Sequence, residues 1–203
     1  MWLQRALLVL CQVHLAVKGN TFLKEFRMPG IRVYKSDAYV CYAEPLPRGK
    51  SYITSFQPIY NEIVTHHMLL FACQEKPTTD SNPWNCDNEM VSQPVCAGNS
   101  MILFSWAMNA PGFKMPNDTS IPVGGTVYDY LVLQVHYKDI KYFAASPDHT
   151  DSSGWLLTMQ TTPSKYLAGI YLFVMDGAVR PFGFSESSVF RYLIVPKNCY
   201  INP

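Results

Sequence analysis

An alternation of apolar and polar side chains with a period of two is the feature that most constrains how this chain can fold. Between residues 131 and 136, Leu131, Leu133 and Val135 alternate with Val132, Gln134 and His136. Successive side chains of a β-strand point to opposite faces of a sheet, so this period is typical of strands. Similar short runs occur at residues 37–42, 52–56, 64–71, 101–106, 155–160, 169–174 and 189–195.

Turn-forming residues separate these runs. They are Pro45-Leu46-Pro47, the stretch 77–83, Pro111-Gly112, Val123-Gly124-Gly125, Ser152-Ser153-Gly154 and Pro181-Phe182-Gly183. No segment shows twelve or more residues at helical spacing. Short strands between turn signals predict an all-β protein, an antiparallel jelly-roll-type sandwich of about eight or nine strands. We expect residues 20–203 to form a single domain, because two full-sized domains would not fit in 203 residues.

The charge balance argues against a nucleic-acid binder. Sixteen Lys and Arg residues face fifteen Asp and Glu residues, which leaves a formal net charge of +1. Such a chain has no global field to attract nucleic acid or an anionic membrane. Hydrophobic residues make up 48% of the chain and charged residues only 15%, so a folded globular protein is expected rather than a disordered one.

Residues 1–19 are interpreted as a signal peptide. One basic residue precedes a mostly apolar run from Ala6 to Val17, and small residues allow cleavage before Asn20. The alternatives are a first core strand or a membrane anchor, but about twelve residues are too few for a span. We therefore expect a protein of the secretory pathway, secreted or in the granule lumen, with no transmembrane segment in the mature chain. Asn117 begins a glycosylation sequon.

Five cysteines remain in the expected mature chain, because Cys11 lies in the signal peptide. Four are clustered at Cys41, Cys73, Cys86 and Cys96, and Cys199 is distant. None has the Cys-x-x-Cys spacing of a zinc knuckle, and an oxidising compartment favours disulfides. The spacing alone leaves all three pairings of the four open and makes Cys199 an odd thiol.

Three histidines stand inside strongly apolar strands: His66, His67 and His136. Each could be a core histidine bonded to a backbone carbonyl. Adjacent residues of a regular strand point to opposite faces, so His66 and His67 could share a metal only at a twist or bulge. Three neutral imidazoles could then hold copper or zinc with one position open. His149 lies in a polar loop and is predicted to face solvent, with a fourth metal ligand as the alternative.

Several runs resemble the copper type II, ascorbate-dependent monooxygenases. They are Arg27-Met28-Pro29-Gly30, Ser36-Asp37, residues 65–73 (THHMLLFAC), 84–87 (WNCD), 105–111 (SWAMNAP), 123–125 (VGG), 131–137 (LVLQVHY) and 168–172 (AGIYL). The match spans about residues 26–183 in family order. The sequence looks more like the peptidylglycine alpha-hydroxylating members of that family than like those that hydroxylate dopamine.

The resemblance implies particular roles. His66, His67 and His136 match the ligands of the first copper, which passes an electron from the reductant ascorbate toward an oxygen-activating site. The matching cysteines are bridged as Cys41 with Cys86 and Cys73 with Cys96. The family's jelly-roll architecture agrees with the sandwich expected from the alternation.

A departure from the family bears on activity. The family's second domain supplies a His-x-His pair, a methionine ligand and the residues that hold the peptide carboxylate, whereas this sequence contains no His-x-His. No catalytic residue, nucleophile elbow or phosphate-binding loop is identified either. We expect half of an enzyme that hydroxylates the alpha carbon of a C-terminal glycine with molecular oxygen. The alternatives are a secreted non-catalytic copper-binding module or regulator, and a histidine-liganded zinc hydrolase.

Overall fold

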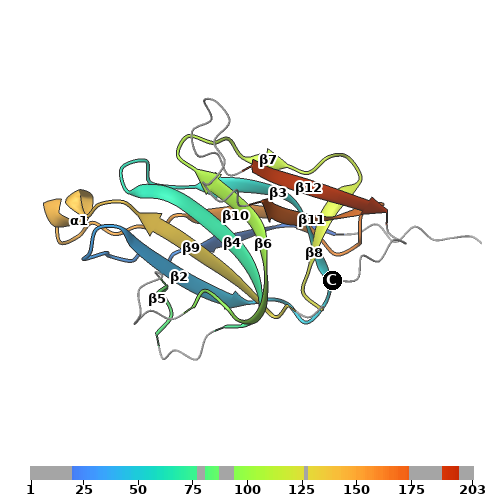
Figure 1. Cartoon of the computed structure of the whole chain (residues 1–203), viewed down its shortest axis with the longest axis horizontal. Helices are drawn as coiled ribbons and strands as arrows, with labels where there is room; N and C mark the ends of the chain where they lie inside the picture. The colour runs from blue at the N-terminus through green and yellow to red at the C-terminus, as the bar shows by residue number, and fades with distance from the viewer. Residues whose placement is uncertain (1–19, 77–80, 87–93, 126–127, 174–188, 197–203) are drawn as a thin grey trace, which may run out of the picture.

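Two β-sheets packed face to face make up the fold. The structure is a computed structural model, and it describes residues 20–76, 81–86, 94–125, 128–173 and 189–196. Within these residues the sheets form a sandwich, and one short helix lies at one end of it (Figure 1). The predicted all-β class is confirmed. No helix in these ranges has the length and apolar character needed to cross a membrane.

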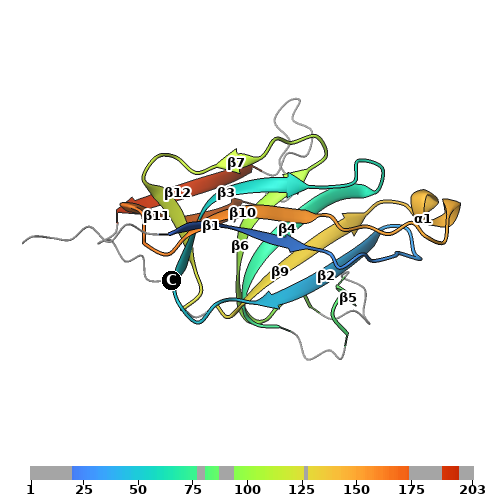
Figure 2. The same cartoon turned by 180° about the vertical axis from the view of Figure 1, so that it is seen from behind.

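The first sheet has seven strands. Its order is β1 (Thr21–Arg27), β10 (Gly154–Gln160), β3 (Ser51–Ile59), β8 (Thr119–Val123), β11 (Tyr166–Phe173) and β12 (Val189–Pro196), and β7 (Phe113–Lys114) pairs with β3 outside this path. Its neighbouring strands are antiparallel except β8 and β11, which pair in parallel. Figure 2 shows this sheet from the opposite side of the molecule.

The second sheet has five strands and carries the candidate site. Its order is β5 (Trp84–Asn85), β2 (Ala38–Pro45), β9 (Tyr130–Tyr137), β4 (Thr65–Glu75) and β6 (Ala97–Ala107), and all of its pairs are antiparallel. Strand β9 is therefore the central strand, with β2 and β4 as neighbours.

The main core lies between the two sheets. Aromatic rings bridge them: Phe56 of β3 stacks on Phe104 of β6 with ring centroids 4.6 Å apart, and Trp155 of β10 meets Phe104 edge-on at 5.3 Å. Strand β9 adds Leu133 and Val135, both fully buried. Burying one such side chain contributes roughly 1.5–3 kcal/mol, so the alternating apolar positions hold the sheets together.

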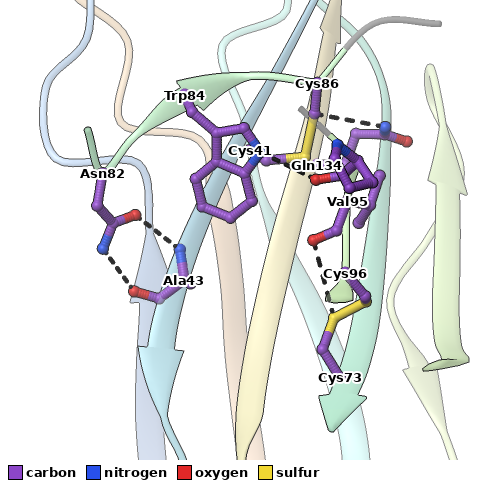
Figure 3. Close-up of a disulfide and its surroundings, with 10 residues drawn as sticks. Cys41, Ala43, Cys73, Asn82, Trp84, Cys86, Val95, Cys96 and Gln134 are labelled. Atoms are coloured by element: carbon purple, nitrogen blue, oxygen red, sulfur yellow. Dashed lines mark hydrogen bonds between the residues drawn. A yellow bond between two sulfur atoms is a disulfide. The ribbon is translucent and has the colours of Figure 1, made fainter. Parts of the chain in front are cut away.

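A second, smaller core covers the outer face of the five-stranded sheet. It consists of the buried residues Cys41, Ala43, Cys73, Trp84, Cys86 and Val132. Disulfides join Cys41 to Cys86 and Cys73 to Cys96 (Figure 3). This cover explains why β9 is buried along nearly its whole length on both faces.

The described residues contain twelve strands, more than the eight or nine predicted. The alternation did not single out β1, β5, β7 and β8. Strands β5 and β7 have two residues each, too few to show a period. Strand β8 contains Pro122, a residue typical of turns. Strand β1 buries only Phe26 fully, so its apolar pattern is weak.

Helix α1 (Lys141–Ala145) was not predicted, because its five residues are too few to show a helical period. The Arg32 guanidinium donates to the carbonyls of Phe143 and Ser146, which lie at the end of this helix. Carbonyls at a helix end lack partners within the helix and need such a donor. The predicted signal peptide (1–19), Cys199 and the turn at 181–183 lie outside the described residues.

Candidate metal centre

A β-bulge brings the adjacent histidines to one face of the sheet. Along the β4–β9 pair, Thr65 opposes Tyr137 and His67 opposes His136, which leaves His66 as an extra residue between the two pairs. Since a bulge adds one residue to one strand, it changes the side to which the following side chain points. His66 and His67 can share a metal only if they depart from the regular alternation of side chains. The bulge provides this departure.

His66, His67 and His136, called the histidine triad below, converge through the same ring atom. The Nδ1 atoms of His66 and His136 are 3.0 Å apart, those of His67 and His136 3.2 Å, and those of His66 and His67 3.3 Å. Three corners of a tetrahedron around a metal with bonds of about 2.0 Å would be about 3.3 Å apart. The spacing of the nitrogens fits a small transition-metal ion, and copper accepts imidazole ligands.

His136 is the most enclosed of the triad, with 5% of its surface exposed. The ring of Tyr39, opposite it on β2, stacks on it with centroids 4.2 Å apart and planes 8° apart. The Nε2 atom lies 2.7 Å from Oδ1 of Asp37. A carboxylate only accepts hydrogen bonds, so Nε2–H donates and Nδ1 keeps its lone pair for a metal. Neither neighbour was singled out as a site residue, although Asp37 lies in a run that resembles the family.

A buried polar corner adjoins the bulge. The Asp151 carboxylate accepts from the Tyr137 hydroxyl at 2.7 Å, from the Ser153 hydroxyl at 2.7 Å and from the Ser153 N–H at 3.1 Å. The Thr65 hydroxyl lies 2.8 Å from Ser153 Oγ. Thr65 and Tyr137 directly precede and follow His66 and His136 in the chain, so this corner ties down both strands next to the histidine triad.

Replacing Asp151 with alanine should lower the free energy of unfolding by about 3 kcal/mol or more. The change leaves buried donors of Tyr137 and Ser153 without an acceptor, and each such group costs roughly 1–3 kcal/mol. Chemical denaturation of the metal-free protein measures the effect. Asp148→Ala is the matched control, because Asp148 is exposed in the same loop and should change stability by less than about 0.5 kcal/mol. Equal effects of the two changes would contradict this role.

Burial and neighbouring charges disfavour the protonated forms of His66 and His67. Desolvation, followed by the charges of His136 and His66, lowers the pKa of His67 to about 4. Desolvation, with His136 and Lys138 nearby, also lowers the pKa of His66. Protons and metal ions compete for the same lone pairs. The lowered pKa values of His66 and His67 therefore keep their lone pairs available to a metal at lower pH than those of free imidazoles.

The metal-free protein should lose stability as the pH falls from about 6.5 to about 4. The folded pKa of His67 lies below the usual value of 6.5, so in this window the unfolded chain binds more protons. Stability then rises with pH across the window and is lost as pH falls through it. Denaturant titrations at several pH values should give a smaller slope for His67→Gln than for the wild type. An unchanged slope would contradict the lowered pKa.

The prediction that His149 faces solvent is wrong. Its side chain is half-buried, its ring stacks on Tyr142 with centroids 4.3 Å apart, and Nδ1 lies 2.6 Å from the Tyr142 carbonyl oxygen. The polar residues around it suggested exposure, but the fold of the loop after α1 places the ring against Tyr142. The cluster of possible metal ligands within the described ranges contains the histidine triad and does not include His149.

His149→Ala should therefore lower the free energy of unfolding by roughly 1–3 kcal/mol. The variant loses the ring stack on Tyr142 and a hydrogen bond, each worth roughly 0.5–1.5 kcal/mol. Copper affinity should stay at the wild-type value. Thermal unfolding and a copper titration of the same preparation test both parts, and a loss of copper binding would make His149 a ligand after all.

The Cys41–Cys86 disulfide lies against strand β9 close to the histidine triad. Cys41 on β2 opposes Gln134 on β9, two residues before His136. The Gln134 side chain donates from Nε2 to Cys86 Sγ at 3.6 Å (Figure 3). Asn82 continues the contact with the β2 edge, because its side-chain amide exchanges two hydrogen bonds with the Ala43 backbone. The segment 81–86 is thus fastened to β2 close to the triad.

The fold and the site define a β-sandwich protein with a three-histidine centre suited to a transition metal. A sequence profile of the copper type II ascorbate-dependent monooxygenase N-terminal domain matches residues 24–144, more than half of the chain. The chain belongs to this copper- and ascorbate-dependent monooxygenase family, and the resemblance noted in its sequence is confirmed.

Individual relatives agree with this assignment. Over 169 residues the chain is 36% identical to the peptidyl-glycine alpha-amidating monooxygenase of Mus musculus, covering 82% of this chain and 16% of that protein. It is 39% identical to the peptidyl-glycine alpha-amidating monooxygenase B of Xenopus laevis, covering 81% and 18%. A DBH-like monooxygenase protein 2 of Mus musculus is 27% identical. The chain thus spans less than a fifth of the length of the two amidating enzymes.

Proposed function

We propose that this chain is the copper-binding, electron-transfer half of a peptidylglycine monooxygenase. The observation that supports the proposal best is the convergence of three Nδ1 atoms within 3.0–3.3 Å of one another. His66, His67 and His136 would be the copper ligands. A copper ion held there would supply one-electron transfer, with ascorbate as the reductant.

The protein's own part would be to hold the ligands still. The bulge places His66 beside His67, the Asp151 corner ties down the strand ends, and Tyr39 restricts the plane of the His136 ring. Electron transfer is favoured by a ligand set that does not rearrange between oxidation states. A triad mounted on two adjacent strands of a disulfide-braced sheet meets that need.

The substrate would be a peptide that ends in glycine, hydroxylated at its alpha carbon with molecular oxygen. This step is proposed from the relatives, which are named peptidyl-glycine alpha-amidating monooxygenases. Hydroxylation would require a second copper and a cation for the peptide carboxylate. Within the part of the chain that the structure describes, the histidine triad is the one group of three or more side chains placed to hold a metal. We propose that a second domain supplies these parts.

The deciding experiment supplies the chain with copper, ascorbate, oxygen and a glycine-extended peptide. We expect ascorbate to reduce the bound copper to the cuprous state, without hydroxylation of the peptide by this chain alone. Adding a separately expressed second domain of a related enzyme should restore turnover. Copper that ascorbate cannot reduce would exclude the electron-transfer role. Reduction without turnover in any mixture would favour a non-catalytic copper-binding module or regulator.

We also propose a location in the secretory pathway, with residues 1–19 as the signal peptide and residues 20–203 as one domain. Two disulfides support an oxidising compartment. Asn117 is exposed at the turn before β8, where a glycan could be attached, and its sequon partner Thr119 donates to the Asn117 carbonyl at 3.2 Å. Glycosidase treatment of the protein from secreting cells would show a mass shift that Asn117→Gln abolishes.

A further inference from the structure

We propose that Asp37 is a positioning residue that prepares His136 for metal binding. Its carboxylate accepts the proton on Nε2 of His136, so that the lone pair of Nδ1 points toward His66 and His67. The inference rests on the proposed copper site and adds a residue to it. Asp37 touches none of the reacting groups, so it would act through His136 alone.

The contact is short and joins an exposed group to an enclosed one. Oδ1 of Asp37 lies 2.7 Å from Nε2 of His136. The His136 side chain is 7% exposed, whereas the Asp37 side chain is 79% exposed. A neutral imidazole carries its proton on either nitrogen, and the partner of one nitrogen decides which. Without the carboxylate, His136 could place its proton on Nδ1 and lose the lone pair that faces the other two ligands.

The backbone conformation at position 37 limits which residues can accept the hydrogen bond from His136 Nε2. Asp37 has a φ of +59°, a left-handed conformation that most side chains avoid and that Gly, Asn and Asp tolerate. Its N–H donates to the Lys138 carbonyl at 3.1 Å, which anchors the turn to the residue two positions after His136. Glycine would satisfy the backbone but not His136. Aspartate satisfies both, because its short side chain reaches the ring from the turn.

Because Asp37 is exposed, its effect on metal affinity can be distinguished from its effect on folding stability. Pairs in which one partner is this exposed contribute little to folding, usually less than about 1 kcal/mol. A partner that orients a metal-binding histidine affects metal affinity far more, by roughly 10–100-fold. Tyr39 fixes the plane of the ring through stacking, but a stacked ring does not choose between Nδ1 and Nε2. The nitrogens of His66 and His67 that face Nδ1 can either donate or accept, whereas the carboxylate that faces Nε2 can only accept, so Asp37 favours the proton on Nε2.

The test uses the full chain with Asp37→Gly, which keeps the left-handed turn and removes the carboxylate. We expect copper affinity, measured by competition with a chromophoric copper chelator, to fall roughly 10–100-fold. Asp37→Asn keeps the turn and an acceptor oxygen, and should recover part of that loss. The matched control is Asp118→Gly, since Asp118 also has a positive φ (+56°) and lies in the turn before β8. This control should bind copper like the wild type.

A second readout does not involve copper. In the metal-free protein, ¹⁵N NMR of the His136 ring should show the proton on Nε2 in the wild type and a shift toward Nδ1 in Asp37→Gly. Unchanged affinity, an unchanged Nε2-protonated ring, or an equal loss in Asp118→Gly would each overturn the proposal. If the wild type and His136→Ala take up copper equally, the proposed copper site itself fails. That result is distinct from a failure of Asp37 alone.

Discussion

Replacing His136 with alanine should lower the copper affinity of this chain by at least 10–100-fold. Loss of a residue that merely orients a ligand already has an effect of that size, and His136 would be a direct ligand. Its Nδ1 atom lies 3.0 and 3.2 Å from those of His66 and His67, so its removal takes away one of three converging donors. Competition with a copper chelator, at fixed pH and salt, measures the affinity.

The control for this change is His149→Ala, which removes a half-buried histidine outside the triad. It should retain wild-type affinity, and circular dichroism should show that both variants are folded. Equal copper loading of His136→Ala and the wild type would exclude the histidine triad as the copper site. Parallel losses in the two variants would point to a general loss of fold instead.

Removing the Cys41–Cys86 bridge, by changing both cysteines to alanine, should lower the free energy of unfolding by about 4 kcal/mol. The bridge closes a loop with a sequence separation of 45, and the loop-entropy model gives this magnitude. Copper affinity should fall as well, because the bridge contacts Gln134, which lies two residues before His136 on strand β9. Denaturant unfolding and copper titration of the same variant measure the two effects.

The second bridge provides the comparison. Cys73–Cys96 has a sequence separation of 23, and Cys73 opposes Tyr130 at the far end of β9 from His136. Its removal should lower stability by about 3 kcal/mol but change copper affinity less than removal of the first bridge. The reverse order of the two effects on copper would contradict the link through Gln134. Peptide mapping without reduction should find the two pairs as described, and Cys41 joined to Cys73 would overturn them.

Much of the fold could be predicted, because side chains buried on one face of a sheet alternate along the sequence with those on the other face. The runs at 52–56, 101–106, 131–136 and 155–160 lie in strands, and the run at 64–71 does so from Thr65 onward. Most of their buried apolar residues belong to the core between the sheets, whereas Val132 belongs to the smaller outer core. Strands β5 and β8 escaped prediction, because one is two residues long and the other contains a proline. Pairing with neighbours, rather than local pattern, makes these segments strands.

The site was predictable in its members but not in its geometry. His66, His67 and His136 stood out as imidazoles in apolar strands, and the resemblance assigned them to a metal. Their convergence depends on the bulge at His66, which the Thr65–Tyr137 and His67–His136 pairings define. The prediction for His149 was wrong because its position also depends on tertiary contacts. The residues next to it are polar, and its contact with Tyr142 forms only in the folded loop.

The sequence by itself determined the all-β class, the three candidate ligands and the family, because periodicity and motifs are properties of local runs. Only the tertiary structure decided that the ligands meet through Nδ1, and that Asp37, Tyr39 and Asp151 surround them. These contacts join residues far apart in the chain, across strands whose register no local pattern specifies. The physical reason is that a register shift of one residue turns every side chain to the other face, so strand pairing decides which groups meet.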